Sequence, residues 1–349
     1  MPVIDAEALL AWYRANRRVL PWREEITPYR VWISEIMLQQ TRVEAVKDYY
    51  RRFLDALPTV YDLASVPDEL LMKLWQGLGY YSRARNLKRA ATEIVSRFGG
   101  ELPRSAAELL SLPGIGRYTA AAIASIAFGE RIAAVDGNVL RVYARFTGDE
   151  SDILEDATKR KFEAAITADM PCAGSDCGDF TQAMIELGAT VCLPKGEPKC
   201  DVCPLCDACV ARRSGKTADL PVKRKKRDRR IEERTVLLLR CGDRFGLMKR
   251  PDEGLLASLY EPINLLGALP EEEIRAWLSA RGISHGDITD VGEAVHIFTH
   301  IEWRMHGYLI DVSTIPSSAE VMLATVREMD SEYAIPSAYR YFVRKMKAL

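Results

Sequence analysis

The sequence lacks the features that mark membrane-spanning and secreted proteins. Its 349 residues contain no apolar run long enough to cross a bilayer, and no charged start followed by an apolar stretch. It also has no internal repeat and no low-complexity tract. The length predicts two or three domains, each able to bury its own core. We therefore expect a soluble protein of the cell interior that has no membrane partner.

An excess of one charge sign is also missing, because the net charge is −1. The charges are nevertheless unevenly distributed: residues 231–349 carry 13 Lys and Arg against 18 Asp and Glu, whereas residues 1–230 carry 35 against 31. The basic charge is most concentrated at residues 223–230. Such a run is typical of a solvated linker, with phosphate contact or nuclear targeting as alternatives. Its place between two predicted domains favours a linker that also touches DNA.

Hydrophobic periodicity divides the chain into a helical part and a mixed part. Helical patterns occupy residues 6–16, 28–57, 68–74, 83–98, 106–112 and 119–128. Two β-like runs at 235–240 and 245–249 flank Cys241-Gly242-Asp243-Arg244, a hairpin signal. Residues 271–281 and 318–329 have helical patterns, and 296–312 has a strand pattern. We therefore predict an all-α domain at 1–213, a basic linker at 214–234 and a smaller α+β domain at 235–349.

The most informative segment is the turn Leu112-Pro113-Gly114-Ile115-Gly116 and the helix after it. Two glycines let backbone N–H groups approach an anion closely, and a helix N-terminus favours negative charge. Gly114 and Gly116 are therefore candidate phosphate contacts, with an ordinary helix–helix turn as the alternative. The segment resembles the helix-hairpin-helix motif of DNA-repair glycosylases related to endonuclease III. Members of that superfamily that also cut the strand have a nucleophilic lysine where this chain has Tyr118.

Five of the eight cysteines lie within 18 residues. In a chain expected inside the cell, this density predicts a metal centre rather than disulfides, although thiolate spacing alone does not separate zinc from iron–sulfur. The resemblance implies one [4Fe-4S] cluster. The family spacing C-x6-C-x2-C-x5-C is matched, with one extra residue in the first loop, by Cys192, Cys200, Cys203 and Cys209. Cys206 departs from that pattern and offers a competing set with Cys200, Cys203 and Cys209.

Two carboxylates, Glu35 and Asp136, have complementary properties for the removal of a base from a sugar. Glu35 lies in an apolar helical stretch, where burial would raise its pKa and keep a proton available near neutral pH; a surface glutamate is the alternative. Asp136 precedes a predicted helix and could also be its N-cap. Cleavage of an N-glycosidic bond passes through an oxocarbenium-like sugar, which needs an acid for the leaving base and an anion near the sugar. We assign Glu35 to the first role and Asp136 to the second, leaving open whether Asp136 attacks the sugar carbon.

Motifs in the N-terminal part resemble one branch of the superfamily, the MutY-type adenine DNA glycosylases. The resemblance covers nearly the whole chain and is carried by residues 20–23 (Leu-Pro-Trp-Arg), 34–41 and 77–87. It implies that Asn138 lies beside Asp136, and that wedge residues replace the stacking lost when a base leaves the duplex. The residues implied to surround the extruded adenine are Trp22, Arg23, Glu35, Tyr118 and Gln182. Those implied at the wedge are Gln40, Leu78 and Tyr80. Taken singly, Trp22 and Tyr80 could equally be core aromatics.

The C-terminal part resembles the Nudix-like module of the same enzymes. Residues 236–239 and 254–261 match its opening, but the three glutamates at 271–273 lack the spacing of the R-E-x-x-E-E metal-binding helix. The resemblance implies a recognition role, in which Phe298, Thr299 and His300 read 8-oxoguanine. Thr299 stands where the family has serine and keeps the hydroxyl. A β-strand with alternating Phe298 and His300 is the alternative.

The resemblance as a whole implies a monofunctional enzyme of base-excision repair. It would remove adenine opposite 8-oxoguanine or guanine in double-stranded DNA and leave an abasic site without lysine-dependent strand cleavage. We expect a monomer that is cytoplasmic and, in a bacterium, associated with the nucleoid. Three alternatives stay open: a glycosylase for another base such as mismatched thymine, a non-enzymatic iron–sulfur protein that binds DNA, and a Nudix hydrolase.

Overall fold

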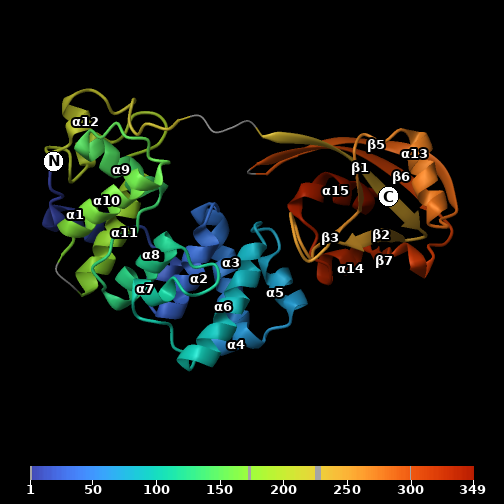
Figure 1. The fold of residues 1–349 in the computed structure, drawn as a ribbon, viewed down its shortest axis with the longest axis horizontal. Coiled ribbons are helices and arrows are strands. Elements are labelled where there is room, and N and C mark those ends of the chain that lie inside the picture. The colour runs from blue at the N-terminus through green and yellow to red at the C-terminus, as the bar shows by residue number, and fades with distance from the viewer. Residues whose placement is uncertain (1, 172–173, 225–228, 299) are drawn as a thin grey trace. The chain divides into compact units, whose positions relative to one another are not determined.

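The computed structural model describes residues 2–171, 174–224, 229–298 and 300–349. The chain divides into two compact units. The first unit contains Met1–Val66 and Asn86–Lys225, and the second contains Pro67–Arg85 and Lys226–Leu349. Figure 1 shows helices through the N-terminal part of the chain and a sheet in the C-terminal part. No helix among the described residues is long and apolar enough to span a membrane.

The described elements up to residue 213 are all helical, as predicted. They are α1 (Ala6–Asn16), η1 (Pro21–Arg23), α2 (Pro28–Leu38), α3 (Val43–Ala56), α4 (Val60–Ser65), α5 (Asp68–Trp75), α6 (Ser82–Phe98), α7 (Ala106–Leu109), α8 (Arg117–Phe128), α9 (Gly137–Thr147), α10 (Asp156–Asp169), α11 (Ser175–Thr190), η2 (Cys200–Val202) and α12 (Val210–Arg213).

One prediction for this part is wrong: residues 28–57 form two helices rather than one. The helix ends at Leu38, and Gln40 takes a left-handed backbone conformation with φ +56° before α3 begins. A non-glycine residue rarely adopts this conformation, so local periodicity gave no warning of the break.

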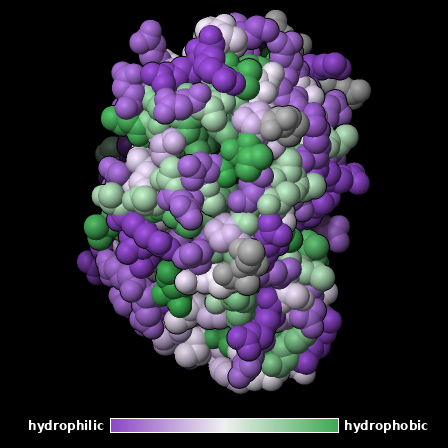
Figure 2. All heavy atoms as spheres, turned by 90° about the vertical axis from the view of Figure 1, so that its left-hand side faces the viewer, coloured by the Kyte–Doolittle hydropathy of each residue, from purple (hydrophilic) through white to green (hydrophobic). Residues whose placement is uncertain are grey.

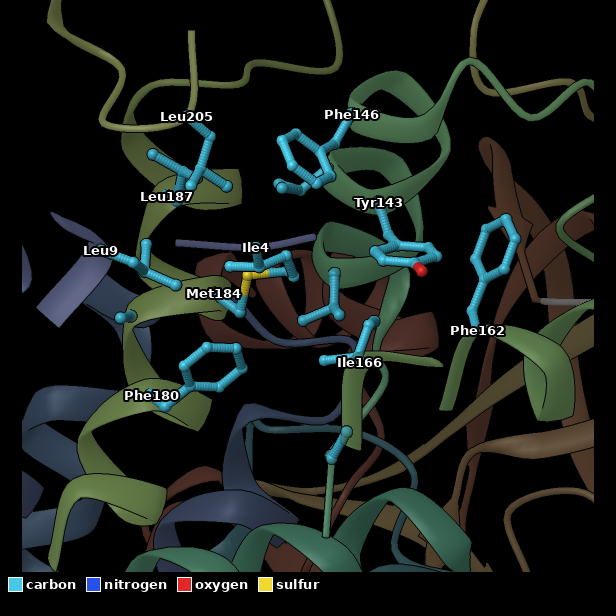
Figure 3. Close-up of a cluster of buried hydrophobic side chains, with 14 of the residues drawn as sticks. Ile4, Leu9, Tyr143, Phe146, Phe162, Ile166, Phe180, Met184, Leu187 and Leu205 are labelled. Atoms are coloured by element: carbon cyan, nitrogen blue, oxygen red, sulfur yellow. The ribbon is translucent and has the colours of Figure 1, made fainter. Parts of the chain in front are cut away.

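The main core of the first unit lies around α11, which packs against α1, α8 and α9. Figure 3 shows this core, a single cluster to which α9 contributes Tyr143 and Phe146 and α11 contributes Phe180 and Met184. Leu205, from the cysteine-rich loop, is buried in the same cluster, and three of the cysteines pack against its edge. The loop is therefore docked on the core that carries α9 and α11.

The second unit holds a seven-stranded sheet with the order β3-β2-β1-β6-β5, to which β4 and β7 add by pairing with β1 and β2. Strand β1 runs parallel to β6, and the other pairs are antiparallel. The strands are β1 (Arg230–Cys241), β2 (Arg244–Lys249), β3 (Tyr260–Glu261), β4 (Ile263–Leu266), β5 (His285–Ile297), β6 (Ile301–Val312) and β7 (Met322–Thr325). The helical elements are α13 (Glu271–Ala280), η3 (Ser317–Ala319), α14 (Val326–Ser331), η4 (Ser337–Tyr339) and α15 (Arg340–Ala348).

Both faces of the sheet are covered, because alternate residues of β1 point to opposite sides. Val236 and Leu238 join a cluster that contains Phe342 of α15. Leu237 and Leu239 join another, which contains Ile274 of α13. The molecule thus combines a helical part with an α+β part, as predicted.

The local predictions for the second unit have mixed outcomes. The hairpin is confirmed, because Cys241 pairs with Arg244 across Gly242 and Asp243. The helix at 318–329 is wrong: residues 322–325 form β7, which pairs with β2, and only the end of the run is helical. A short apolar run has no clear period, so its pairing partner decides its structure. Strand β1 also begins at Arg230, inside the stretch predicted as linker.

On the face drawn in Figure 2, hydrophilic residues surround small, separate apolar areas. Scattered apolar residues of this kind are normal on a protein surface.

Candidate active site and thiol centre

The local sequence of α2 places Glu35 inside the first unit. Thr27 caps the helix by accepting a hydrogen bond from the Arg30 N–H at 3.2 Å, and Pro28 supplies a pre-set first position. Seven consecutive residues, 31–37, are buried. Because neighbours cover this helix on nearly every side, Glu35 is only 8% exposed although it is a carboxylic acid.

The surroundings of Glu35 keep its proton near neutral pH. Burial is the main reason that the pKa of the Glu35 carboxyl is raised to about 7. The hydrogen bond with Tyr118 and the Arg23 charge act to lower this pKa, and the Asp136 charge acts to raise it. Burial also raises the pKa of Tyr118 well above its ordinary value, so its hydroxyl stays a donor. The structure therefore brings Glu35, Tyr118, Asp136 and Arg23 together, as the sequence interpretation required.

Asp136 is the N-cap of α9, the alternative role that its position in the sequence allowed. One carboxylate oxygen accepts hydrogen bonds from the N–H groups of Asn138 and Val139, each at 2.8 Å. The other accepts from the Asn138 side-chain amide, also at 2.8 Å. Burial raises the pKa of Asp136, and these donors oppose that shift. The cap thus holds the carboxylate in a single orientation.

A chain of hydrogen bonds connects Asp136 with the cysteine-rich loop. Arg141 donates to the Asn138 side-chain oxygen at 3.0 Å and to the carbonyls of Gly188 and Cys192, both at 2.8 Å. One turn later, Arg145 donates to the Cys192 sulfur at 3.3 Å. Helix α9 therefore carries the Asp136 cap at one end and contacts the first cysteine of the loop along its side.

Close helix packing at Gly188 completes this arrangement. A Cβ at position 188 would lie 2.6 Å from the Asn138 Cβ, a distance that real contacts essentially never show. Glycine is therefore required for α11 to approach the residue that orients Asp136.

The remaining residues predicted around the base lie on η1 and α11. Trp22 is buried and packs edge-on against Tyr50, with ring centroids 5.6 Å apart. Arg23 donates from Nε to the Gln182 side-chain oxygen at 3.1 Å. Both Arg23 and Arg18 also donate to Glu186, a buried carboxylate one turn beyond Gln182.

The glycine turn has the conformation expected of a tight hairpin between α7 and α8. Gly114 has φ +76°, and Gly116 is the N-cap residue of α8 without any side-chain cap. A Cβ on Gly116 would meet no atom within 4 Å, so the backbone there is open to an approaching group. The first N–H groups of α8 are available for an anion.

The thiols of the cysteine-rich loop gather around one small cavity. Its volume is about 30 Å³, and it is lined by Cys192, Cys200, Cys203, Cys206 and Cys209 together with Arg145 and Arg212. None of these five cysteines forms a disulfide. Among the described residues, no group of three or more His, Cys, Asp or Glu side chains has the geometry of a metal site. The thiols therefore line one cavity without having the spacing of bound metal ligands. The donor set, with two cations beside it, fits a thiolate-bound iron–sulfur centre.

Two of the three residues predicted at the wedge have an unusual backbone. Gln40 and Tyr80 are both exposed and have positive φ angles of +56° and +47°. Strain of this kind is often found at functional sites. Leu78, in contrast, is only 6% exposed.

Within the second unit, Leu78 and Tyr80 line a cavity of about 440 Å³ together with Phe298 and His300. The structure thus brings two of the residues implied at the wedge together with two of those implied in reading the opposing base. Thr299 lies outside the described residues.

Backbone hydrogen bonds fix the described residues Phe298 and His300. Phe298 donates its N–H to the Ile301 carbonyl at 2.8 Å, and the His300 carbonyl accepts from the Arg230 N–H at 3.1 Å. The Phe298 ring packs edge-on against His296 and Trp303, at centroid distances of 4.6 and 4.9 Å. Phe298 therefore belongs to a packed aromatic row as well as lining the cavity.

Sequence reasoning missed Arg18, Glu186, Arg141 and Arg145. A signal was present, because Arg141 and Arg145 are four residues apart, as are Gln182 and Glu186, in otherwise apolar helical stretches. Residues with this spacing share one helix face, and a charge on an apolar face needs a partner. The identity of those partners depends on tertiary packing.

Comparison with known proteins agrees with both parts of the fold. Residues 33–167 match the family model of the HhH-GPD superfamily base excision DNA repair protein. Residues 235–345 match the model of the NUDIX domain.

Curated relatives named adenine DNA glycosylase match most of the chain. The protein from Arabidopsis thaliana is 37% identical over 87% of this chain, which spans 56% of that relative's length. The human protein is 34% identical over 89% of this chain and 69% of its own length. The protein from Buchnera aphidicola subsp. Baizongia pistaciae (strain Bp) is 33% identical over 88% of this chain and 86% of its own length.

Solved structures share the helical part. A thermostable thymine-DNA glycosylase covers 60% of this chain with a TM-score of 0.53 and 29% identity, and 95% of that chain is matched. Endonuclease III in a non-covalent complex with DNA covers 60% with a TM-score of 0.50 and 26% identity, again with 95% of that chain matched. With its helix-hairpin-helix part, its Nudix part and these relatives, the chain belongs to the adenine DNA glycosylase family.

Proposed function

We propose that this protein removes adenine from double-stranded DNA where it lies opposite 8-oxoguanine or guanine. The observation that carries the proposal is the buried pair of Glu35 and Asp136, in which one carboxyl has a pKa of about 7. A proton source next to an oriented anion is the arrangement that N-glycosidic cleavage needs. The names of the relatives support adenine as the base.

Glu35 acts as the general acid. At neutral pH a large part of it is protonated, so it can transfer its proton to a ring nitrogen of the leaving adenine as the bond to the sugar breaks. The carboxylate left behind accepts the Tyr118 hydrogen bond and lies near the Arg23 charge, which both favour the ionised form.

Asp136 stabilises the positive charge that develops on the sugar. Three hydrogen bonds from α9 hold its carboxylate, so little reorganisation is needed in the transition state. Asn138 keeps the second oxygen in place. Position 118 carries a phenol rather than an amine, so no Schiff base with the sugar forms there. Water completes the reaction and leaves an abasic site, which makes the enzyme monofunctional.

The other predicted residues bind the substrate. Trp22, Arg23 and Gln182 surround the extruded base, while Gln40, Leu78 and Tyr80 occupy the gap that it leaves in the stack. Gly114 and Gly116 contact the backbone phosphates through N–H groups. Phe298, Thr299 and His300 read the opposing base.

We assign Cys192, Cys200, Cys203 and Cys209 to a [4Fe-4S] cluster, with Cys206 as a neighbouring thiol. When bound, it supplies metal–thiolate bonds that tie the loop to the core. The five thiols around one cavity and the Arg145 contact with Cys192 support this assignment. The visible absorbance of the purified protein, together with iron and sulfide analysis, separates an iron–sulfur centre from zinc.

We also propose that the chain works as a monomer, with residues 1–213 for catalysis, 214–234 as a basic linker and 235–349 for recognition.

The test is direct: a duplex with adenine opposite 8-oxoguanine is incubated with the protein and then treated with alkali. Cleavage at the adenine only after alkali supports a monofunctional adenine glycosylase. Cleavage without alkali would contradict the monofunctional mechanism, and absence of cleavage at adenine in the presence of intact protein would contradict the activity. A duplex with a thymine mismatch provides the control for another base.

A further inference from the structure

A buried carboxylate lies on α11, one turn beyond Gln182, and the proposed reaction gives it no direct role. Glu186, on α11, is 1% exposed and accepts hydrogen bonds from Arg18 and Arg23. Arg18 donates from its backbone N–H at 3.2 Å and from Nε and Nη2 at 2.7 and 2.9 Å. Arg23 donates from Nη2 at 2.9 Å. Although burial opposes it, these bonds hold the pKa of Glu186 below its usual range, so it is ionised.

The same contacts orient Gln182. Arg23 uses Nη2 for Glu186 and Nε for the Gln182 side-chain oxygen, so a single guanidinium spans two side chains of α11. A guanidinium only donates, so the amide must turn its oxygen toward Arg23. The amide NH₂ group of Gln182 is then the end that remains for another acceptor. Ring nitrogens of adenine are acceptors of this kind.

The network also bears on the charge near Glu35. Three charged or titratable groups influence Glu35: Tyr118 on α8, Asp136 at the start of α9, and Arg23 on η1. Arg23 favours the ionised form of Glu35, and Glu186 neutralises part of the combined charge of Arg23 and Arg18. Without the Glu186 charge, the positive field at Glu35 would be larger.

We propose that Glu186 is a positioning residue, which holds Arg23 so that Gln182 presents its NH₂ group to the base and which limits the positive charge at the general acid. This inference rests on the proposed adenine glycosylase activity. Glu186 itself does not touch the substrate.

The test is the isosteric variant Glu186→Gln, assayed under single-turnover conditions on adenine opposite 8-oxoguanine. An amide offers one acceptor oxygen in place of two, so Arg18 and Arg23 no longer share it as before. We expect the rate to fall about 10- to 100-fold, since small misplacements near a reacting group have effects of that size. The alkaline midpoint of the rate should move to lower pH, because Glu35 then loses its proton more readily. The conservative variant Glu186→Asp keeps the charge and should restore the midpoint.

A matched control lies on the same helix. Asp179 pairs with the half-exposed Arg14 at 3.1 Å, outside the site, so Asp179→Asn should leave both the rate and the midpoint unchanged. A second variant gives the opposite sign: Arg18→Gln leaves Glu186 paired with Arg23 alone, so the Arg23 charge near Glu35 is neutralised more fully and the alkaline midpoint should move to higher pH. Because Arg18 is 37% exposed, this variant carries the test even if Glu186→Gln does not fold.

The experiment distinguishes failure of the positioning role from failure of the proposed glycosylase activity. An unchanged rate and midpoint in folded Glu186→Gln, or shifts of the same sign in Glu186→Gln and Arg18→Gln, would overturn the positioning role. A lower melting temperature with an unchanged rate would mean that Glu186 only stabilises the fold, and would also overturn it. If the wild-type protein does not release adenine, the proposed function fails instead.

Discussion

Glu35 in the first unit and Glu261 in the second are equally buried, at 8% and 7% exposure, but their surroundings differ. Glu261 accepts two hydrogen bonds from Arg250 at 2.7 and 2.8 Å, and further bonds from Tyr339 and Asn264. Glu35 has a hydrogen bond with Tyr118, and the charges of Asp136 and Arg23 also act on it. One buried carboxylate is saturated with donors, and the other is not.

The number of hydrogen-bond donors separates a carboxylate that stabilises the fold from one that takes part in the reaction. A buried ion pair with all its lone pairs satisfied holds its neighbours in place, here Arg250 and Tyr339 beside Trp303. A buried carboxyl with few donors is instead held close to its protonated form, so it can give up a proton near neutral pH. Burial alone therefore does not identify the acid; the number of donors around it does.

The strongest test of this comparison is Glu35→Gln beside Glu261→Gln. Glutamine at 35 cannot donate a proton in the same way, so excision should fall by about 10²- to 10⁴-fold or more while DNA binding is retained. Glutamine at 261 breaks a buried ion pair and should cost about 3 kcal/mol of unfolding free energy with the chemical step intact. Single-turnover kinetics and chemical denaturation measure the two effects. If Glu35→Gln lost DNA binding as strongly as it lost excision, Glu35 would have a structural role.

Replacement of the second carboxylate should have the next largest effect. Asp136→Asn keeps the shape of the cap but removes the negative charge, so we expect a rate about 10²- to 10³-fold lower. The unfolding free energy should change by only about 1 kcal/mol, as for other cap substitutions. A rate that follows the loss of stability, rather than exceeding it, would contradict the catalytic role.

A substitution outside the site should act through packing. Gly188→Ala would place a methyl group 2.6 Å from the Asn138 Cβ, so Asn138 and the Asp136 carboxylate that it holds must shift. We expect about a 10- to 100-fold lower rate with unchanged DNA affinity. Gly137→Ala is a matched control, because a Cβ there meets nothing within 4 Å. Similar rates for the two variants would show that the close approach is not needed.

The pH dependence should show the raised pKa of Glu35 in both rate and stability. The excision rate should fall as the pH rises through about 7, since Glu35 then loses its proton. The folded-state pKa is higher than the ordinary 4.5, so the folded protein retains a proton that the unfolded chain has lost. Stability from this group is therefore present below pH 4.5 and lost as the pH rises to about 7. Glu35→Gln should then be more stable than the wild type at pH 8, by up to about 3 kcal/mol, but not at pH 4. Denaturation at the two pH values checks this sign.

The smallest expected effect concerns the opposing base. Thr299→Ala removes the hydroxyl proposed to meet 8-oxoguanine, and should lower the preference for 8-oxoguanine over guanine by about tenfold, the size of one lost hydrogen bond. The ratio of the two single-turnover rates measures it. An unchanged ratio would remove position 299 from recognition.

The sequence was sufficient to predict the two fold classes, most helices and the N-cap role of Asp136, because these depend on local patterns. The end of helix α2 was not predicted, because the left-handed backbone at Gln40 has no local sequence signature. Strand β7 was missed because its structure depends on pairing with β2.

The candidate site was predicted only in part for the same reason. The chemistry of base removal drew attention to Glu35 and Asp136, and a resemblance drew attention to Gln182. The spacing of Glu186 and Arg141 indicates only that each needs a partner, and the partner is defined when α9, α11 and η1 are brought together. Glu186 is 163 residues from its partner Arg23, and Arg141 is 47 residues from its partner Gly188. Periodicity cannot report contacts at that separation.

The role of Glu35 is tested most directly by the release of adenine from a duplex opposite 8-oxoguanine, followed in one turnover for the wild type and Glu35→Gln. We predict alkali-dependent cleavage at the adenine for the wild type, with a rate that falls above pH 7, and almost no cleavage for the variant at any pH. Equal adenine release by the two proteins would contradict the role of Glu35 as the buried acid.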